Sequence, residues 1–91
     1  MAKQYLALDV GERRIGVASA SSDVKIAVPG DWIDVDGKEL DIIREMLIDE
    51  SIDVLVVGYP RNQRGEPTAQ TRYVENFVDS LGQIESDVVF Q

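Results

Sequence analysis

The hydrophobic positions of this 91-residue chain form several short apolar runs and two longer periodic stretches. Residues 5–10 are nearly all apolar, which is typical of a strand buried on both faces. Residues 15–20 are small or β-branched, and the turn-like residues 11–14 join the two runs into a predicted hairpin. Residues 25–35 predict a third strand that is broken or bulged at Pro29 and Gly30.

Two segments repeat apolar residues at the spacing of a helix. The first begins at Asp36, whose side chain is expected to accept a hydrogen bond from the Glu39 amide while the Glu39 carboxylate reaches back. It ends at residues 51–53, and its apolar stripe consists of Leu40, Ile42, Ile43, Met46 and Leu47. The second segment begins with Thr68 as a simple N-cap and stops at Gly82, with an apolar stripe of Val74, Phe77, Val78 and Leu81.

Two further strands complete the pattern. Residues 54–58 form a continuous apolar run that is typical of a central parallel strand, and residues 87–91 begin a last strand. The order β-β-β-α-β-α-β predicts one α/β domain over residues 1–91, with an antiparallel meander followed by right-handed crossovers in a mixed sheet. The aromatic residues are spaced like core residues rather than like a base-stacking platform: Tyr5, Trp32, Tyr73, Phe77 and Phe90.

Composition restricts the chemistry that this chain can perform. It contains no cysteine and no histidine, so candidate sites depend on carboxylates, hydroxyls, amides and cations. The net charge of −8 argues against non-specific binding to nucleic acid, which depends on cations that neutralise phosphates. No signal peptide or membrane span is recognisable, so a cytoplasmic location without a membrane partner is expected.

The basic residues are unevenly placed. Five of the nine lie in or beside two glycine-containing loops: Arg13, Arg14, Arg61, Arg64 and Arg72. They predict either a local cationic rim on an acidic body or ordinary solvated surface charge.

Asp9 is the first candidate for chemistry, because it stands near the end of an apolar strand and just before a glycine turn. A carboxylate in such a strand needs a cation, a metal ion or backbone amides as partners. An alternative interpretation is that Asp9 caps the 11–14 turn or pairs with one of its arginines.

The loop of residues 57–65 is the second candidate. It leaves the carboxyl end of a parallel strand, where open α/β sheets place their ligands. Gly58 permits a close approach of the backbone, and donors suited to phosphate follow it: Arg61, Asn62 and Arg64. The helix start at Thr68, Thr71 and Arg72 offers further amides for an anion. Either segment could equally be a plain connection or a simple cap.

Taken together, the two loops resemble the YqgF (RuvX) family. Residues 6–18, LALDVGERRIGVA, resemble the opening motif of that family, and residues 53–60, DVLVVGYP, with Gly65 resemble its Gly-x-Pro loop. Residues 27–29 and the helix of residues 72–81 also fit. The resemblance implies a ribonuclease H-like fold, and its members are assigned as nucleases that mature the 5′ end of precursor 16S ribosomal RNA. Relatives of the fold include Holliday junction resolvases.

The resemblance also implies roles for individual residues. Asp9 matches the first-strand aspartate of a site for Mg²⁺ or Mn²⁺, in which metal ions hold a phosphodiester for hydrolysis. Arg13 and Arg14 match a basic hairpin turn. The second loop matches through Gly58, Pro60 and Gly65, and we expect it to contact precursor ribosomal RNA or branched DNA together with Arg61, Asn62, Arg64 and Arg72.

One departure from the family pattern affects these expectations. The family has an Asp-Glu-Arg segment after the strand that matches residues 88–91, and a later helix supplies another aspartate. This sequence contains neither, so the domain is expected to be incomplete at its C-terminus and inactive alone. An uncovered sheet edge also predicts self-association, as a homodimer or by exchange of an element between chains.

Two other functions are compatible with the same residues. Actin-like and sugar-kinase-like proteins also use an Asp-x-Gly turn between two strands to approach nucleotide phosphates. A non-catalytic interaction module with a protein or ribosome-associated partner would keep the fold without the chemistry, and the acidic net charge suits that interpretation.

Overall fold

The computed structural model describes residues 2–59, 64–66 and 68–91. The elements follow one another as β1 (Gln4–Val10), β2 (Arg14–Ser21), β3 (Val24–Pro29), β4 (Ile33–Asp34), α1 (Glu39–Asp49), β5 (Val54–Val57), α2 (Ala69–Leu81) and β6 (Asp87–Phe90). The predicted strands and helices are therefore present. The break predicted at Pro29 and Gly30 is confirmed, because it divides the third strand into β3 and β4.

The strands form one mixed sheet in the order β3-β2-β1-β5-β6, with β4 paired to β2 beside β3. The pairs of β2 with β1, β3 and β4 are antiparallel, whereas β5 is parallel to both β1 and β6. The helices α1 and α2 separate the parallel strands in sequence, as a parallel connection requires. This α/β architecture is consistent with the expected ribonuclease H-like fold.

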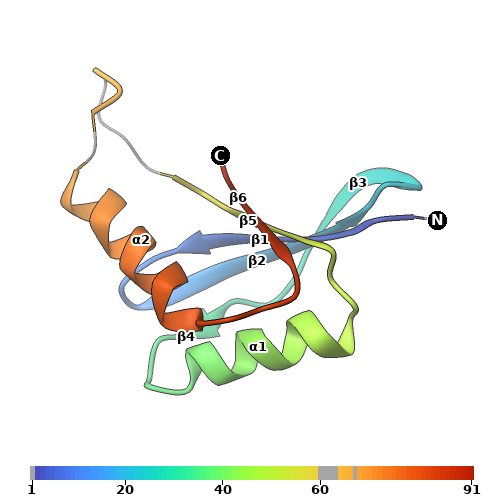
Figure 1. Cartoon of the computed structure of the whole chain (residues 1–91), viewed down its shortest axis with the longest axis horizontal. Helices are drawn as coiled ribbons and strands as arrows, with labels where there is room; N and C mark the ends of the chain where they lie inside the picture. The colour runs from blue at the N-terminus through green and yellow to red at the C-terminus, as the bar shows by residue number, and fades with distance from the viewer. Residues whose placement is uncertain (1, 60–63, 67) are drawn as a thin grey trace.

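Both described helices pack on the same face of the sheet (Figure 1). The hydrophobic core lies between them and that face, and it consists of Leu6, Leu8, Val10, Ile15, Val17, Ile33, Ile43, Leu47, Ile52, Leu55, Val57, Val74 and Leu81. Within β1, Leu6, Leu8 and Val10 point to the core, because successive side chains of a strand alternate between its two faces. We call this side of the sheet the covered face.

The centre of the opposite side of the sheet, which we call the open face, is formed by small or β-branched residues around one carboxylate: Ala7, Asp9, Gly16, Ala18 and Val56. The prediction that β1 is buried on both faces is therefore wrong. Ala7 is half-buried and Asp9 is exposed, because no helix among the described residues covers this side. The open face is consequently accessible along the centre of the sheet.

The start of α1 differs from the predicted capping box. The Asp36 carboxylate accepts a hydrogen bond from the Lys38 amide (3.1 Å), and the Glu39 carboxylate accepts one from the Gly37 amide (2.7 Å). Lys38 is the N-cap and its side chain makes no capping bond. Asp36 thus stabilises the turn before the helix, and the predicted bond from the Glu39 amide to Asp36 is wrong.

The start of α2 confirms its predicted N-cap. The Thr68 hydroxyl accepts a hydrogen bond from the Thr71 amide (3.3 Å), and the Thr71 hydroxyl accepts one from the Thr68 amide (2.9 Å). These reciprocal bonds satisfy amides that lack a partner within the helix. Gly82 ends the helix at a φ of 74°, which glycine adopts without strain.

Arg44 of α1 couples the two helices. Its guanidinium donates to the carbonyl oxygens of Leu81 (3.0 Å) and Ser80 (2.8 Å) at the end of α2, and Asp41 accepts from the same group (2.8 Å). The last carbonyls of a helix lack intrahelical donors and carry partial negative charge, so a cation there is favourable. Within the described ranges, neither helix is long and apolar enough to cross a membrane.

Asp53 aligns the first residues of three strands. Its carboxylate accepts a hydrogen bond from the Gln4 amide (2.8 Å), and its own amide donates to the Gln4 carbonyl (2.9 Å). Its carbonyl accepts from the Asp87 amide (2.9 Å). This single residue therefore joins the beginnings of β1, β5 and β6.

The aromatic residues divide into two groups. Tyr73 and Phe77 pack against the core, as predicted, and Tyr5 is half-buried. In contrast, Trp32 is 62% exposed and Phe90 is 43% exposed, so the assignment of these two residues to the core is wrong. Trp32 follows the break in the third strand, and Phe90 lies on β6 at the edge of the sheet.

Candidate metal and nucleic-acid site

Asp9 lies on the open face between two glycines. Across the β1–β2 ladder it faces Gly16, and on its other side the Gly58 amide donates to the Leu8 carbonyl (3.0 Å) as β5 ends. A Cβ atom on Gly16 would lie 3.5 Å from the Asp9 Cβ, so a side chain there would fill the space beside the carboxylate. The two glycines therefore leave the carboxylate accessible from both sides.

A shallow depression of about 390 Å³ surrounds this position. It is lined by Ala7, Leu8, Asp9, Gly16, Val17, Ala18, Val56, Gly58 and Gln91. It lies toward the carboxyl ends of the parallel strands β1 and β5, where open α/β sheets bind their ligands. Asp9 and Gly58 of the second glycine-containing loop thus border the same hollow.

The Asp9 carboxylate has no hydrogen bond or ion pair with the part of the chain that the structure describes. The 11–14 turn is closed instead by its own backbone, because the Gly11 amide donates to the Arg14 carbonyl (3.0 Å). The described geometry therefore gives no support to the alternative in which Asp9 caps the turn or pairs with an arginine. An exposed carboxylate without such partners fits the oxygen ligand of a hard cation.

The ligand set for a metal ion is nevertheless small. Among residues 2–59, 64–66 and 68–91, no three acidic side chains lie close enough together to hold a metal ion. Asp9 thus contributes one ligand within this region, and the remaining positions around a cation would be open to water, substrate or further groups.

The β1–β2 turn, which follows the strand that carries Asp9, contains two arginines. Arg13 and Arg14 are exposed, and the Arg13 carbonyl accepts a hydrogen bond from the Val35 amide (2.9 Å), which holds the turn against the end of β4. Gly11 is required for this turn, because a Cβ atom there would lie 2.7 Å from the Arg14 carbonyl oxygen.

Arg14 also contacts an aromatic ring. Its guanidinium carbon Cζ lies over the Trp32 ring, 4.8 Å from the ring centroid. Sequence reasoning grouped Trp32 with the core and missed its contact with Arg14. The only sequence signal was its place just after the break at Pro29 and Gly30, where the alternation of the third strand is interrupted.

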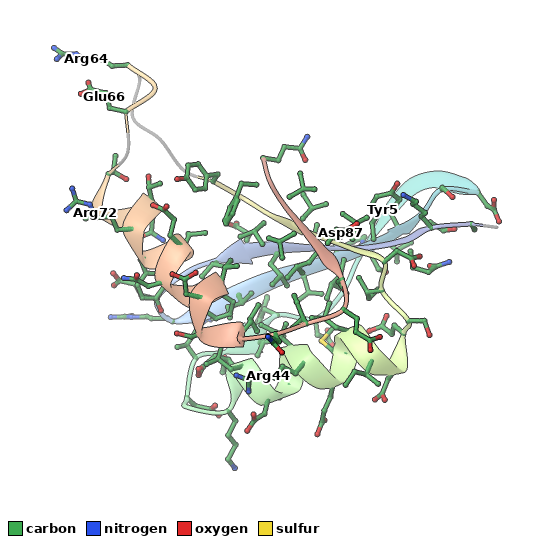
Figure 2. All side chains as sticks on the ribbon, viewed as in Figure 1. Tyr5, Arg44, Arg64, Glu66, Arg72 and Asp87 are labelled. Atoms are coloured by element: carbon green, nitrogen blue, oxygen red, sulfur yellow. The ribbon has the colours of Figure 1, made fainter. Side chains whose placement is uncertain are left out.

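The second loop is described only in part. Gly58 borders Asp9, whereas Pro60, Arg61 and Asn62 lie outside the described residues. Arg64 and Glu66 lie away from the sheet (Figure 2), and Gly65 turns the chain between them at a φ of 76°. The structure therefore brings Gly58 to Asp9 but places Arg64 and Gly65 away from it.

Arg72 lies in the first turn of α2 and is exposed (Figure 2). That turn is attached to the sheet by Gln70, whose side-chain amide donates to the Val10 carbonyl at the end of β1 (3.2 Å). Sequence reasoning also missed Gln70, because a polar residue on a helix surface gives no indication of its partner. The start of α2 and the β1–β2 turn therefore meet at the same edge of the sheet.

A larger depression, of about 750 Å³, lies at the opposite ends of these strands. Its lining includes Ile48, Ser51, Asp53, Ile84 and Asp87. It contains neither glycine-containing loop nor Asp9. We place the candidate site in the smaller hollow, because an accessible carboxylate and the glycines beside it occur together there.

Comparison with known proteins identifies the family of this chain. A model of the RuvX family, described as Holliday junction resolvase, matches residues 3–90. The chain belongs to the RuvX family. A relative from Chloroflexus aurantiacus, named as a candidate pre-16S rRNA nuclease, is 42% identical over 78 residues, which are 84% of this chain and 51% of the relative. A relative of the same name from Chlorobium chlorochromatii is 34% identical over 79 residues, 87% of this chain and 56% of the relative.

The chain spans about half the length of these RuvX-family relatives. Among solved structures, YeaZ from Pseudomonas aeruginosa matches 98% of this chain and 44% of its own, at 18% identity and a TM-score of 0.46. A likeness this weak supports no argument. The family assignment therefore rests on the sequence comparisons.

Proposed function

We propose that Asp9 binds Mg²⁺ or Mn²⁺ as part of a nuclease that acts on structured RNA, and that the reaction is the 5′-end processing of precursor 16S ribosomal RNA. The observation that supports this most directly is the exposed Asp9 carboxylate between Gly16 and Gly58, without a described partner. The names of the RuvX-family relatives support the substrate. The ribonuclease H-like fold and a cytoplasmic location belong to the same proposal.

The chain's own residues have distinct roles in this proposal. A bound metal ion would supply charge stabilisation at the phosphate and an activated water. Asp9 holds the ion, and Gly58 keeps the adjoining surface low enough for a phosphodiester to approach. Arg13 and Arg14 attract and orient the strand by charge-assisted contacts. Arg72 at the start of α2, together with Pro60, Arg61, Asn62, Arg64 and Gly65 of the second loop, contacts the more distant part of the substrate.

We further propose that residues 1–91 do not cleave RNA by themselves. Several carboxylates are needed to fix the metal ions of a phosphodiester hydrolase, and the described residues bring only Asp9 to the hollow. The remaining ligands would come from residues beyond this chain, either in a polypeptide of the length of its relatives or in a second chain. Self-association of this chain would be one way to supply them.

Metal binding tests the role of Asp9 directly. Mn²⁺ titrations followed by electron paramagnetic resonance should show a site in the wild-type chain that Asp9→Asn removes, because the amide lacks the charge of the carboxylate. Asp87→Asn is the matched control, since Asp87 is another exposed strand aspartate, but it lies beside Val54 at the starts of the parallel strands. Equal Mn²⁺ binding by Asp9→Asn and wild type would refute the proposal.

Cleavage assays test whether residues 1–91 hydrolyse RNA by themselves. We expect no hydrolysis of a 5′-extended ribosomal hairpin by the chain alone in Mg²⁺ or Mn²⁺. Robust cleavage that Asp9→Asn abolishes would show that the site is complete without other residues, and would still support a nuclease. A four-way DNA junction in the same assay tests the resolvase reaction that the family description names.

Binding measurements separate the remaining alternatives. An affinity for ATP that exceeds the affinity for RNA would favour a nucleotide-phosphate binder. Binding of a protein or ribosomal partner that survives Asp9→Ala and ignores divalent metal ions would favour a non-catalytic module. The nuclease proposal requires instead that RNA binding strengthens when Mg²⁺ is added and that Asp9→Asn removes this effect.

A further inference from the structure

Trp32 is an exposed aromatic side chain in a defined orientation. Its exposed fraction is 62%, and the Arg14 guanidinium lies over its ring at 4.8 Å from the centroid. This is the separation of a cation–π pair, in which the cation restricts the ring without covering both of its faces. An indole ring exposed in this way offers a large flat face on which another ring can stack.

The strand register places Trp32 beside the Asp9 site. Arg14 faces Asp34 and Ile15 faces Ile33 across the β2–β4 pair. The Gly30 amide donates to the Val17 carbonyl (2.8 Å), so Asp31 and Trp32 together lie opposite Gly16. Because Ile15 and Ile33 point to the core, Arg14 and Trp32 point to the open face, as their contact confirms.

Gly16 therefore lies between Asp9 and Trp32. It faces Asp9 on β1, and it contributes no side chain to the space between the two residues. The backbones at Asp9 and Trp32 are two strand spacings apart, about 10 Å. A nucleotide next to a phosphate at Asp9 can therefore reach the indole ring across Gly16.

We propose that Trp32, oriented by Arg14, is a stacking platform for an unpaired base of the strand whose phosphate lies at Asp9. This inference rests on the proposed function and specifies its substrate class: a strand with an unpaired nucleotide beside the bond to be cleaved. A base inside a duplex has both faces covered by its neighbours, whereas an unpaired base offers a free face to an aromatic ring.

The charge distribution favours base stacking over a second phosphate contact. Asp31 and Asp34 flank Trp32 in the sequence, and the whole chain has a net charge of −8. Such surroundings repel a phosphate, whereas stacking on an indole ring does not depend on positive charge. An arginine over the same ring extends the flat surface on which a base can lie.

Trp32 also provides the measurement, because it is the sole tryptophan of the sequence. Its fluorescence should be quenched when the chain is titrated, in Mg²⁺, with an RNA hairpin that has a single-stranded 5′ extension. A blunt hairpin with the same stem should quench it less and bind at least several-fold more weakly. Fluorescence anisotropy of labelled RNA gives the affinity of variants without tryptophan.

The variants separate stacking from folding. Trp32→Ala should weaken binding of the extended hairpin on the order of tenfold or more and leave binding of the blunt hairpin unchanged. Trp32→Phe should retain most of the affinity, because a smaller aromatic ring still stacks. Phe90→Leu is the matched control, since Phe90 is also exposed but lies at the other edge of the sheet, and it should behave as wild type.

The outcomes distinguish this inference from the proposed function. If Trp32→Ala binds the extended hairpin as tightly as wild type, or if the wild-type chain does not prefer that hairpin, the stacking platform is refuted. Mn²⁺ binding through Asp9 would be unaffected by that result, because Trp32→Ala leaves the carboxylate in place. If Asp9→Asn instead retains full Mn²⁺ binding while Trp32 is still quenched, the metal site fails and the base contact remains.

Discussion

The two faces of the sheet are formed by the same strands but differ in burial. On β1, Leu6 and Leu8 point to the covered face and are buried, whereas Ala7 and Asp9 point to the open face and are half-buried and exposed. On β5, Val57 is buried in the core, and its neighbour Val56 lines the hollow beside Asp9. Successive side chains of a strand point to opposite faces. Substitutions one position apart should therefore affect either the free energy of unfolding or binding at the candidate site.

The largest contrast is expected between neighbours on β5. Leu55→Ala removes a fully buried side chain and should lower the free energy of unfolding by about 2–5 kcal/mol. Val56→Ala should lower it by only about 1 kcal/mol, because Val56 is half-buried on the open face. Urea unfolding followed by circular dichroism measures both. Equal losses would show that the open face is packed in solution, for example by self-association.

Gly11→Ala should have the next largest effect. The added methyl group would lie 2.7 Å from the Arg14 carbonyl oxygen, so the turn must open and the Gly11–Arg14 hydrogen bond must lengthen. We expect a loss of about 1–3 kcal/mol in unfolding free energy, together with weaker RNA binding through displaced arginines. Full retention of both properties would show that the turn adapts without strain.

Arg44→Met tests how firmly the helices hold the covered face. Methionine keeps much of the apolar stem but removes the donors to the Leu81 and Ser80 carbonyls, so we expect a loss of about 1 kcal/mol. Thermal unfolding monitored by circular dichroism should show the change, whereas Mn²⁺ binding should not. A change in Mn²⁺ affinity would mean that the two faces are coupled through the helices.

Gly16→Ala should have the smallest effect on folding and a distinct effect on the site. Its methyl group would make an ordinary contact with the Asp9 Cβ at 3.5 Å, and alanine in a strand is more favourable than glycine by roughly 0.5–1 kcal/mol. The unfolding free energy should therefore stay equal or rise slightly, while affinity for the extended RNA hairpin falls. If the variant binds this RNA as wild type does, the space between Asp9 and Trp32 is not used.

Local signals predicted most of the fold. Thr68 and Gly82 were placed correctly because a cap and a helix stop depend on a few neighbouring residues. Asp36 was misplaced because its carboxylate can bond either a turn amide or a helix amide, and Gly37, at a φ of 100°, allows the turn. The choice between these bonds depends on backbone angles that the residue types do not determine.

The candidate site was less predictable than the fold. Asp9 was chosen as a candidate, but its exposure was not predicted, because the apolar Ala7 makes β1 resemble a strand buried on both faces. The exposure of Trp32 was not predicted. The break at Pro29 and Gly30 interrupts the alternation of side chains between the two faces, so the sequence does not indicate which face the next residues occupy. Gln70 was missed because its bond to Val10 joins residues 60 positions apart.

The alignment of three strand starts by Asp53 determines which side chains of β1 reach the open face. Asp9 lies five residues beyond Gln4, about 17 Å along β1. The face of the sheet to which its side chain points nevertheless depends on the strand register that begins at Gln4. A slip of one position would turn the carboxylate into the hydrophobic interior and put a leucine in the hollow. Substitutions at Asp53, which lies at the opposite ends of these strands, should therefore alter Mn²⁺ and RNA binding at Asp9 through the register of β1, and circular dichroism should detect the accompanying structural change.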